Sequence, residues 1–576
     1  MKEKPNRIIN WMRRDAVVLL LYLVLTIAFT WPLAARLGDN WLAIHDVDTF
    51  VKVWDQWWLQ HHLDTGQPFF YTNDLFYPVG LDLSYHSISW IVTPFSWLVT
   101  PLLGPIDAYN ITIPWAIFSS AYAAYWLIYY LLQNRIAAFV GGFIFSFSPY
   151  FVTHTGGHPD LVHLAPMPLA VLLLLMTLRD GRSRWGILGT AVLIALAAYT
   201  SLYIMVFTLL TLGLVFIFVA LEEGRWRTGQ FWRSSLWIGL ITAVLLSVRL
   251  WFIFATPQTL DEVIEAKYAA SLNQTDLLAL VTPSHLNPIF APLVEPVSDN
   301  FYTNQKWPAY LGLVPLLLLG LALARRQKRS EIVLWLGTWL LFLLLAAGPI
   351  LRFNGRRYPG IVLPATFLSW FPPIRAVGTP DYFLLGLLLP MGILAAYGFD
   401  FLWQRTGQSP RRRVALLLLI PLLMFELWNG PYHGISAEVH PFYQALAKDP
   451  EPFALIELPL GRQESKIYEF YQTVHGKPMV EGLSARTPQE AYRYINANAL
   501  LRTWDAEIPL DCRFMGKELD TAVAQLLADN FRFVIVHHFS ETEYLLTFFE
   551  PYEPLVQDAA LTVYELSELA QRPFCP

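Results

Sequence analysis

The chain has 576 residues, of which 55% are hydrophobic and 15% are charged, whereas a soluble globular protein is about 45–50% apolar and about 25% charged. This composition excludes an ordinary soluble domain and predicts that lipid surrounds much of the chain. Residues 1–429 hold 29 Lys and Arg against 24 Asp and Glu, and residues 430–576 hold 11 against 21. The basic residues lie in short runs between apolar stretches and not on one polar face, which argues against nucleic acid as a partner.

The first predicted element is the apolar run from Ala16 to Ala35, which follows a basic start from Met1 to Asp15. A signal peptide also begins in this way. However, this run is about as long as a membrane span, and no small-residue cleavage site precedes Arg36. We therefore interpret it as an uncleaved first transmembrane helix.

Further apolar stretches of spanning length follow, several of them separated by Arg-rich turns. With the first, the stretches lie near residues 16–35, 111–132, 136–152, 161–178, 186–201, 203–221, 235–255, 308–324, 331–348, 382–402 and 414–429. The turns are Arg179/Arg182/Arg184, Arg225/Arg227/Arg233, Arg325/Arg326/Lys328/Arg329 and Arg405/Arg411/Arg412/Arg413. Under the positive-inside rule, all four turns belong in the cytoplasm together with the N-terminus.

These positions predict an α-helical polytopic protein of the plasma (inner) membrane, with about eleven transmembrane helices in residues 1–429. The segment Ile88–Leu103, rich in Pro and Trp, must then lie along or dip into the outer leaflet, because a span there would place the later Arg-rich turns outside. The long outer loops are residues 36–110, 256–307 and 349–381. Long loops without regular structure are usually functional, so the chemistry is expected there.

Residues 430–576 show a different pattern and predict a C-terminal extracytoplasmic α/β domain. Its β-type runs are Phe453–Leu460, Arg532–His538 and Leu561–Leu566, and its helical patterns lie near Ser465–His475, Pro488–Trp504 and Leu519–Asn530. The sequence of this domain contains no Gly-rich phosphate loop and no GxSxG, HExxH or CxxC pattern. We therefore assign it no catalytic centre of its own.

The first outer loop carries the most informative motifs. It contains His45–Phe50 (HDVDTF), then Trp54–Trp58 (WDQWW) and Phe76–Leu83 (FYPVGLDL). An acidic group directly after the first helix, followed by an aromatic amphipathic segment and further helices, resembles the GT-C superfamily of membrane glycosyltransferases. These enzymes use polyprenyl-phosphate-linked sugars at the outer face of the membrane.

Other motifs look like those of large bacterial GT-C-like membrane proteins, so the resemblance covers nearly the whole chain. They are Gly157–His163 (GHPDLVH), Tyr310–Gly312 (YLG), Ala347–Pro349 (AGP), Ile374–Ala376 (IRA), Glu457–Pro459 (ELP) and Gln472–Pro478 (QTVHGKP).

The resemblance implies a GT-C glycosyltransferase that transfers a sugar from a polyprenyl-phosphate carrier to an extracytoplasmic glycan, lipid or protein acceptor, with inversion at the anomeric carbon. It also implies a carboxylate in the first outer loop that acts on the acceptor or holds a divalent metal (Mg²⁺ or Mn²⁺) beside the donor phosphate. Asp48 stands where the family's acidic residue is expected, and Asp46 completes a DxD-like pair. The adjacent Asp-Glu pair of some branches is absent, which argues against the protein O-mannosyl and arabinosyl-lipid branches.

For two groups of polar residues, a purely structural role is the alternative to catalysis or metal binding. Asp48 could simply cap the helix that follows it, because Asp is a favoured N-cap residue. His158, Asp160 and His163 have side chains suited to Zn²⁺ or Mn²⁺, but their spacing matches no strong metal signature, and hydrogen bonding in the loop is the alternative.

Two arginines are candidates for contact with the lipid phosphate. Arg249 lies near the outer end of an apolar run, where its charge is costly unless it binds an anion or snorkels to the headgroups. Arg375 lies in a Pro-rich outer loop, where a solvated arginine is the alternative.

The only cysteines, Cys512 and Cys575, both fall in the domain predicted to be extracytoplasmic. Disulfides persist in such an oxidising compartment, so a bridge between the two is predicted, with two free thiols as the alternative.

The rival function is a non-enzymatic transporter or assembly factor for cell-surface polysaccharide. Transporters commonly show inverted repeats and broken helices near the bilayer midplane. No internal repeat is evident in this sequence, which favours the enzyme.

Overall fold

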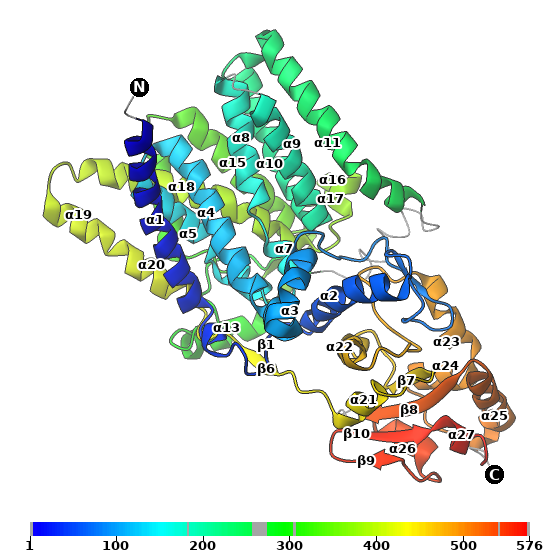
Figure 1. The fold of residues 1–576 in the computed structure, drawn as a ribbon. Coiled ribbons are helices and arrows are strands. Elements are labelled where there is room, and N and C mark those ends of the chain that lie inside the picture. The colour runs from blue at the N-terminus through cyan, green and yellow to red at the C-terminus, as the bar shows by residue number, and fades with distance from the viewer. Residues whose placement is uncertain (1–3, 181–183, 256–272, 303–306, 539–541, 573–576) are drawn as a thin grey trace. The chain divides into compact units, whose positions relative to one another are not determined.

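The computed structural model describes residues 4–180, 184–255, 273–302, 307–538 and 542–572, and it divides into two compact units (Figure 1). Unit 1 comprises Met1–His45, Ile88–Trp251 and Leu260–Ile435, and unit 2 comprises Asp46–Ser87, Phe252–Thr259 and Ser436–Pro576. Residues 46–87, which the sequence placed in the first outer loop, therefore group with the C-terminal residues.

Unit 1 is helical, and most of its long helices run side by side in a bundle (Figure 1). Its helices are α1 (Lys4–Phe29), α3 (Val92–Asn110), α4 (Thr112–Leu132), α5 (Arg135–Ser146), α6 (Pro149–His154), α7 (Pro159–Val162), α8 (Pro166–Asp180), α9 (Arg184–Thr200), α10 (Leu202–Leu221), α11 (Gly229–Ala255), α13 (Ala291–Tyr302), α14 (Leu313–Leu323), α15 (Arg329–Ala346), α16 (Ala365–Leu368), α17 (Pro372–Arg375), α18 (Phe383–Arg405), α19 (Pro410–Leu417) and α20 (Leu419–Leu427). Short 3-10 turns η1 (Leu33–Ala35), η2 (Arg225–Arg227) and η3 (Pro380–Tyr382), and strands β1 (Trp41–Ala43), β4 (Ile350–Phe353), β5 (Arg356–Val362) and β6 (Gly434–Ser436), connect them.

Several of these helices can cross a bilayer, so the chain is a multi-pass membrane protein. Within the described ranges, six are long and apolar enough: Thr112–Leu132, Pro159–Arg179, Leu202–Leu221, Gly229–Trp251, Arg329–Ala346 and Pro380–Arg405. Four shorter apolar helices are Asp15–Phe29, Arg135–Ser146, Arg184–Thr200 and Leu313–Leu323. The predicted total of about eleven spans stays a prediction. α3, which overlaps the predicted outer-leaflet segment, is not among the six and is kinked at Gly104.

α18 forms the core of unit 1, because 94% of the most apolar stretch of Pro380–Arg405 is buried. Its neighbours approach closely where side chains are absent: a Cβ at Gly141 of α5 or at Gly392 of α18 would overlap the carbonyl oxygen of the other glycine. A Cβ at Gly398 would overlap the carbonyl of Leu318 in α14. Small residues allow such contacts between helices in lipid, where no hydrophobic force drives association.

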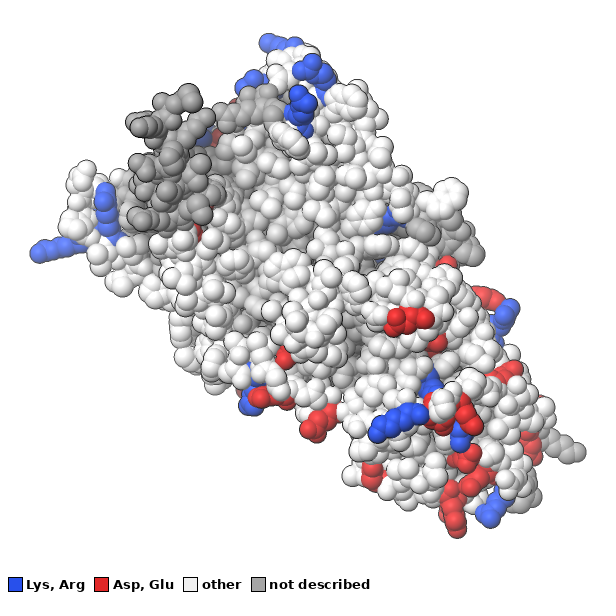
Figure 2. All heavy atoms as spheres, in the orientation of Figure 1, with Lys and Arg blue, Asp and Glu red and all other residues white. Residues whose placement is uncertain are grey.

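Ion pairs gather at one end of unit 1. Asp15, at the start of the apolar part of α1, pairs with Arg135 at the start of α5, and Arg325 after α14 pairs with Asp400 of α18 at 2.6 Å. Arg179 of α8 contacts Glu223 and, at 3.5 Å, Glu331 of α15. Away from such ends, Figure 2 shows wide faces without charged side chains over the helices of unit 1, as expected for surfaces in contact with lipid.

Unit 2 contains a four-stranded sheet of order β7-β8-β10-β9, in which β7 and β8 are parallel and the other pairs antiparallel. Its strands are β2 (Tyr71–Thr72), β3 (Leu81–Asp82), β7 (Ala454–Leu458), β8 (Phe531–His537), β9 (Val556–Gln557) and β10 (Leu561–Glu565). Its helices are α2 (Asp48–Thr65), α21 (Pro441–Leu446), α22 (Ser465–His475), η4 (Gln489–Tyr492), α23 (Arg493–Ala497), α24 (Ala499–Asp505), α25 (Cys512–Ala528), α26 (Glu543–Phe549) and α27 (Leu566–Leu569). Strands therefore occupy all three predicted β-type runs.

The core of unit 2 lies on this sheet, where Leu455, Phe533, Ile535 and Val563 are buried together with Tyr443 of α21. The other faces of these strands are covered as well, since all residues of β7 and nearly all of β8 and β10 are buried. Cys575 and the side chain of Cys512 lie outside the described residues, so the disulfide stays a prediction.

Candidate functional site

The aromatic helix of the first outer loop, α2, begins at Asp48, and the side chain of Asp46 lies beside its N-terminus. The Asp46 carboxylate accepts a hydrogen bond from the backbone N–H of Asp48 at 3.0 Å, and the N-cap position is held by Val47. This contact spans two residues, as in an Asx turn. The N-cap Val47 makes no side-chain cap hydrogen bond, and Asp48 is the first residue of the helix, so Asp48 does not occupy the N-cap position that was considered for it.

The carboxylate of Asp48 forms an ion pair with Lys466, a residue that sequence reasoning missed. Asp48 Oδ1 lies 2.5 Å from Lys466 Nζ, and the Lys466 side chain is only 8% exposed whereas that of Asp48 is 31% exposed. Lys466 lies in the first turn of α22 and also donates to Gln463 Oε1 at 2.8 Å. A nearby cation favours the ionised form of a carboxylate. The pair thus keeps Asp48 charged and in place while leaving part of it accessible to solvent.

Two further charged residues of α2, Lys52 and Asp55, lie one turn and two turns after Asp48. Lys52 Nζ contacts Asp55 Oδ2 at 3.2 Å and donates to the Ser87 carbonyl at 2.9 Å, and Asp55 Oδ1 lies 2.8 Å from His86 Nε2. The Ala485 N–H donates to His86 Nδ1 at 3.1 Å, so the ring proton must be on Nε2. Burial raises the pKa of Asp55, but Lys52 and His86 outweigh it and hold that pKa below its usual value.

Two buried glutamates of unit 2, Glu469 and Glu481, have raised pKa values, in contrast to Asp55. Burial raises the pKa of Glu469 well above its usual value, although its Oε1 accepts the Leu483 N–H at 2.5 Å. Burial also raises the pKa of Glu481 to about 7, and its Oε2 accepts the Gly461 N–H at 2.7 Å. At neutral pH, Glu481 is therefore poised between its two forms, and burial likewise disfavours the ionised form of Glu469.

The two predicted phosphate contacts lie in unit 1, whereas Asp46 and Asp48 lie in unit 2. Arg249 of α11 finds no hydrogen-bond partner for Nε or Nη1 among the residues that the structure describes, and its guanidinium lies 5.9 Å from the centre of the Tyr199 ring. Arg375 is the last residue of α17 and is half-buried. A common site of Asp48 with Arg249 or Arg375 stays a prediction.

The three candidate metal ligands surround α7 in unit 1. His163 Nδ1 donates to the Pro159 carbonyl at 2.8 Å, its ring lies 4.5 Å from that of Trp115, and the ring of His158 faces Trp307 at 5.7 Å. Over the described part of the chain, no group of three or more His, Cys, Asp or Glu side chains could hold a metal ion. The structure does not bring His158, Asp160 and His163 together as a metal centre, and metal dependence stays a prediction.

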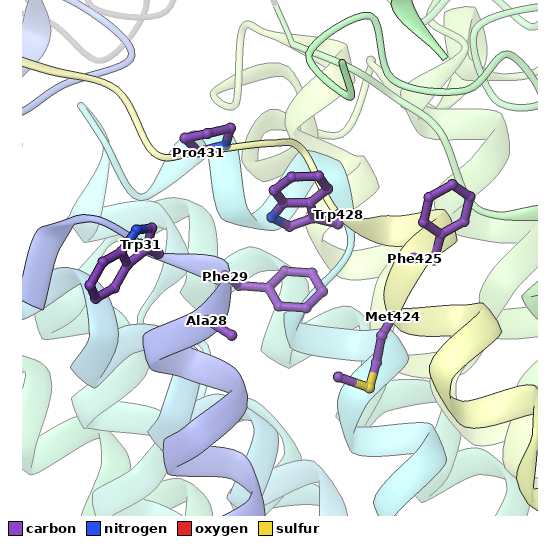
Figure 3. Close-up of a pocket in the computed structure, with 7 residues that line it drawn as sticks. All are labelled: Ala28, Phe29, Trp31, Met424, Phe425, Trp428 and Pro431. Atoms are coloured by element: carbon purple, nitrogen blue, oxygen red, sulfur yellow. The ribbon is translucent and has the colours of Figure 1, made fainter. Parts of the chain in front are cut away.

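An apolar cavity of about 450 Å³ lies between the ends of α1 and α20 (Figure 3). Its lining residues are Ala28, Phe29, Trp31, Met424, Phe425, Trp428 and Pro431. Drug-sized ligands occupy cavities of about 300–1,000 Å³. None of these side chains ionises, so the cavity is suited to a hydrocarbon chain and not to bond-making chemistry.

Comparisons with known proteins place the chain in a family and a fold class. The family model described as "Domain of unknown function (DUF6311)" matches residues 18–424, and no curated protein matches the chain. The arabinofuranosyltransferase AftD from Mycobacteria is similar in structure, with a TM-score of 0.57 and 15% sequence identity over 96% of this chain and 41% of that one. The chain thus spans less than half of the length of AftD.

A second similar structure is the archaeal oligosaccharyltransferase AglB from Archaeoglobus fulgidus, solved in complex with an inhibitory peptide and a dolichol-phosphate. Its TM-score is 0.53 at 9% identity, over 92% of this chain and 70% of that one. At such identities the similarity concerns the fold. The chain belongs to the DUF6311 family, and its fold is that of the GT-C membrane glycosyltransferases.

Proposed function

We propose that this protein is a membrane glycosyltransferase that transfers a sugar from a polyprenyl-phosphate carrier to an extracytoplasmic glycan, lipid or protein acceptor. The observation that carries the proposal is the ion pair of Asp48 with Lys466 at the start of the first outer-loop helix. The fold supports it, since AglB was solved with a dolichol-phosphate. The apolar cavity at the ends of α1 and α20 offers room for a carrier chain.

In the proposed reaction, Asp48 accepts the proton of an acceptor hydroxyl while the hydroxyl oxygen attacks the anomeric carbon. The new glycosidic C–O bond forms as the bond to the phosphate oxygen breaks, and polyprenyl phosphate leaves with the electron pair. Such displacement inverts the anomeric carbon. General-base assistance typically contributes ~10²–10⁴-fold. Asp46 is an auxiliary carboxylate, Arg249 is the proposed contact for the leaving phosphate, and Arg375 is the secondary one.

The decisive experiment compares the wild-type protein with Asp48→Asn, using a panel of polyprenyl-phosphate sugars and measuring release of free carrier phosphate. Because Asn keeps the size but not the basicity of Asp, we expect the transfer rate to fall about a thousandfold, or about 4 kcal/mol, with some loss of thermal stability because Lys466 loses its counter-ion. Asp64→Asn is the matched control, since Asp64 is an exposed carboxylate on the same helix.

Wild-type transfer by Asp48→Asn would remove Asp48 from the catalytic role. If the wild-type protein moves carrier-linked sugars across the membrane and leaves every one of them intact, the protein is a transporter instead.

A further inference from the structure

Three buried polar side chains of unit 1 have hydrogen-bonding atoms without a partner. His154 is 0%, Arg352 2% and Asp381 3% exposed. Among the described residues, nothing pairs with His154 Nε2, with Arg352 Nε and Nη1, or with Asp381 Oδ1. An unsatisfied buried polar group is destabilising, and more so if it is charged. Each such group therefore calls for a partner, which can be a bound ligand.

Tyr150 links two of these groups, although they come from elements far apart in the sequence. His154 Nδ1 donates to the Tyr150 carbonyl at 2.8 Å, and the Tyr150 hydroxyl donates to the Asp381 carbonyl at 2.8 Å. His154 ends α6, and Asp381 lies in the turn η3 before α18. The two unpaired acceptors therefore belong to one cluster.

Aromatic rings and a cation complete this cluster. The His154 ring lies 4.4 Å from the ring of Trp307 and 5.9 Å from that of Tyr382. Arg352, in strand β4, is close enough to Asp381 for their charges to interact. We call His154, Arg352, Asp381, Trp307 and Tyr382 the polar–aromatic cluster.

The unpaired atoms determine which ligand chemistry fits. His154 Nδ1 donates its proton to a carbonyl, and burial, together with the neighbouring His158, lowers the pKa of His154 well below its usual value. Its Nε2 is therefore an acceptor only and Arg352 offers donors only, whereas the carboxyl group of Asp381 accepts and, when protonated, also donates. A hydroxyl group can satisfy both kinds, because it donates and accepts.

Other ligand classes fit less well. A phosphate dianion has no proton to donate to His154 Nε2, and a metal cation would be repelled by Arg352. Small-ligand sites typically combine aromatic walls with a few placed polar groups, as Trp307 and Tyr382 do with the three polar residues. The set therefore favours an uncharged ring that carries hydroxyl groups.

We propose that the polar–aromatic cluster binds a neutral sugar ring, with its hydroxyls on His154, Asp381 and Arg352 and its apolar face against Trp307 or Tyr382. This inference rests on the proposed function, because it assigns the bound ring to the sugar of the donor. It also sets a specificity: a uronic acid would bring a second carboxylate to Asp381, so neutral hexoses or pentoses are preferred.

The test uses the full chain in lipid nanodiscs and saturation-transfer NMR with methyl glycosides of neutral hexoses and pentoses. Methyl glucuronide and inorganic phosphate are the competing probes. We expect saturable binding of at least one neutral glycoside, and at least tenfold weaker binding by Asp381→Asn and by Arg352→Met. Tyr310→Phe is the matched control, because it removes a buried hydroxyl that is already bonded to Glu426 at 2.7 Å.

A second readout separates a binding role from a structural one. Since Arg352→Met removes a buried charge whose Nε and Nη1 are unpaired, the unliganded variant should melt at or above the wild-type temperature. A lower melting temperature, equal glycoside binding by the variants, or preferential binding of phosphate or glucuronide by the wild type would each overturn the proposal. So would the absence of saturable neutral-glycoside binding.

These outcomes are distinguishable from failure of the proposed function. Glycoside binding requires no turnover, so it can be present when the carrier assay detects no transfer. Conversely, if the protein transfers sugar and the Asp381 and Arg352 variants bind glycosides as the wild type does, the proposed function stands and this sugar site is wrong.

Discussion

At the scale of single residues, the pairing of Asp48 with Lys466 changes how the first outer loop is understood. An acidic residue after the first helix could act alone, cap the helix or hold a metal. The structure supplies a nearly buried ammonium instead. An ammonium at this distance favours the charged carboxylate over its protonated form. Lys466 is therefore a positioning residue for the proposed base.

We predict that Lys466→Met lowers the sugar transfer rate at least tenfold, about 1.4 kcal/mol, and moves the acidic limb of the pH–rate profile to higher pH. The reason is that Asp48 loses the cation that favours its ionised form. Lys466→Arg keeps the charge and should restore most of the activity. Kinetics between pH 5 and pH 9 measure both effects.

Lys477→Met is the control for this experiment. Lys477 is also a buried lysine of unit 2, but its Nζ donates to the carbonyls of Asp449 and Glu451 at 2.6 and 2.7 Å. A merely structural role for Lys466 predicts that both variants lose stability and that neither moves the pH profile.

Glu481 carries a second prediction at this scale, on the pH dependence of stability. Its pKa is about 7 in the folded protein against an ordinary value of 4.5, chiefly because it is buried. The folded state thus binds more protons than the unfolded state between these values, and the free energy of unfolding falls as pH rises from about 4.5 through about 7.

Glu481→Gln should therefore raise the melting temperature of unit 2 above pH 7 and leave it nearly unchanged near pH 5. The gain is on the order of 3 kcal/mol at most. Thermal denaturation of the full chain across this range measures it. Asp55 does not produce this effect. Because its pKa is lowered, its contribution to the free energy of unfolding is lost only at more acidic pH. An equal effect of the substitution at pH 5 and pH 8 would contradict this account.

At the scale of elements, α2 and α22 are joined by hydrogen bonds as well as by packing. Trp54 of α2 is fully buried, and its Nε1 donates to Gln472 Oε1 at 2.7 Å. Gln472 Nε2 donates in turn to the carbonyls of Asp74 and Lys477 at 2.8 and 3.0 Å. The segment 46–87 is thereby held to the C-terminal residues in a fixed register, which places Asp48 opposite Lys466.

We predict that Trp54→Phe destabilises unit 2 by about 1–3 kcal/mol, because Gln472 Oε1 then loses its donor inside the protein. Limited proteolysis of the full chain in increasing urea, followed by antibody detection of the C-terminus, measures the change. Trp57→Phe is the control, since Trp57 is only half-buried and packs on His61. If both variants resist proteolysis as the wild type does, the α2–α22 hydrogen bonds contribute nothing measurable to stability.

At the scale of the whole molecule, the Arg-rich turns of unit 1 meet at one end of the helices. The ion pairs of Arg179 with Glu223 and Glu331 join the ends of α8 and α10 to the start of α15, and Arg325 joins the end of α14 to Asp400 of α18. Turns that share one end of a bundle lie on one side of a membrane. Under the positive-inside rule, we expect that side to be the cytoplasm.

A reporter fused after Arg413 is therefore expected to read cytoplasmic, and one fused after Gly430 extracytoplasmic. Paired reporters active on opposite sides, such as a fluorescent protein and alkaline phosphatase, measure this at both sites. The reverse result at either site contradicts the proposed orientation and places Asp48 on the wrong side for an extracytoplasmic acceptor.

The sequence alone determined features that depend on short-range pattern. Apolar length located spans such as Thr112–Leu132, because lipid requires a continuous apolar helix of that size. Short β-type runs located β7, β8 and β10, because each is a short, mostly buried strand. The pattern missed β9, since a two-residue strand shows no periodicity.

The tertiary structure decided which distant side chains meet. No local signal connects Asp48 with Lys466, or Tyr150 with Asp381, because each contact depends on how separate elements pack. The start of α2 is a similar case: Asp46 and Asp48 are equally suitable N-cap residue types, but the backbone geometry of the turn places Val47 at the N-cap and Asp48 in the first turn. The sequence therefore located the loop in which chemistry is expected, and packing selected the partners of its residues.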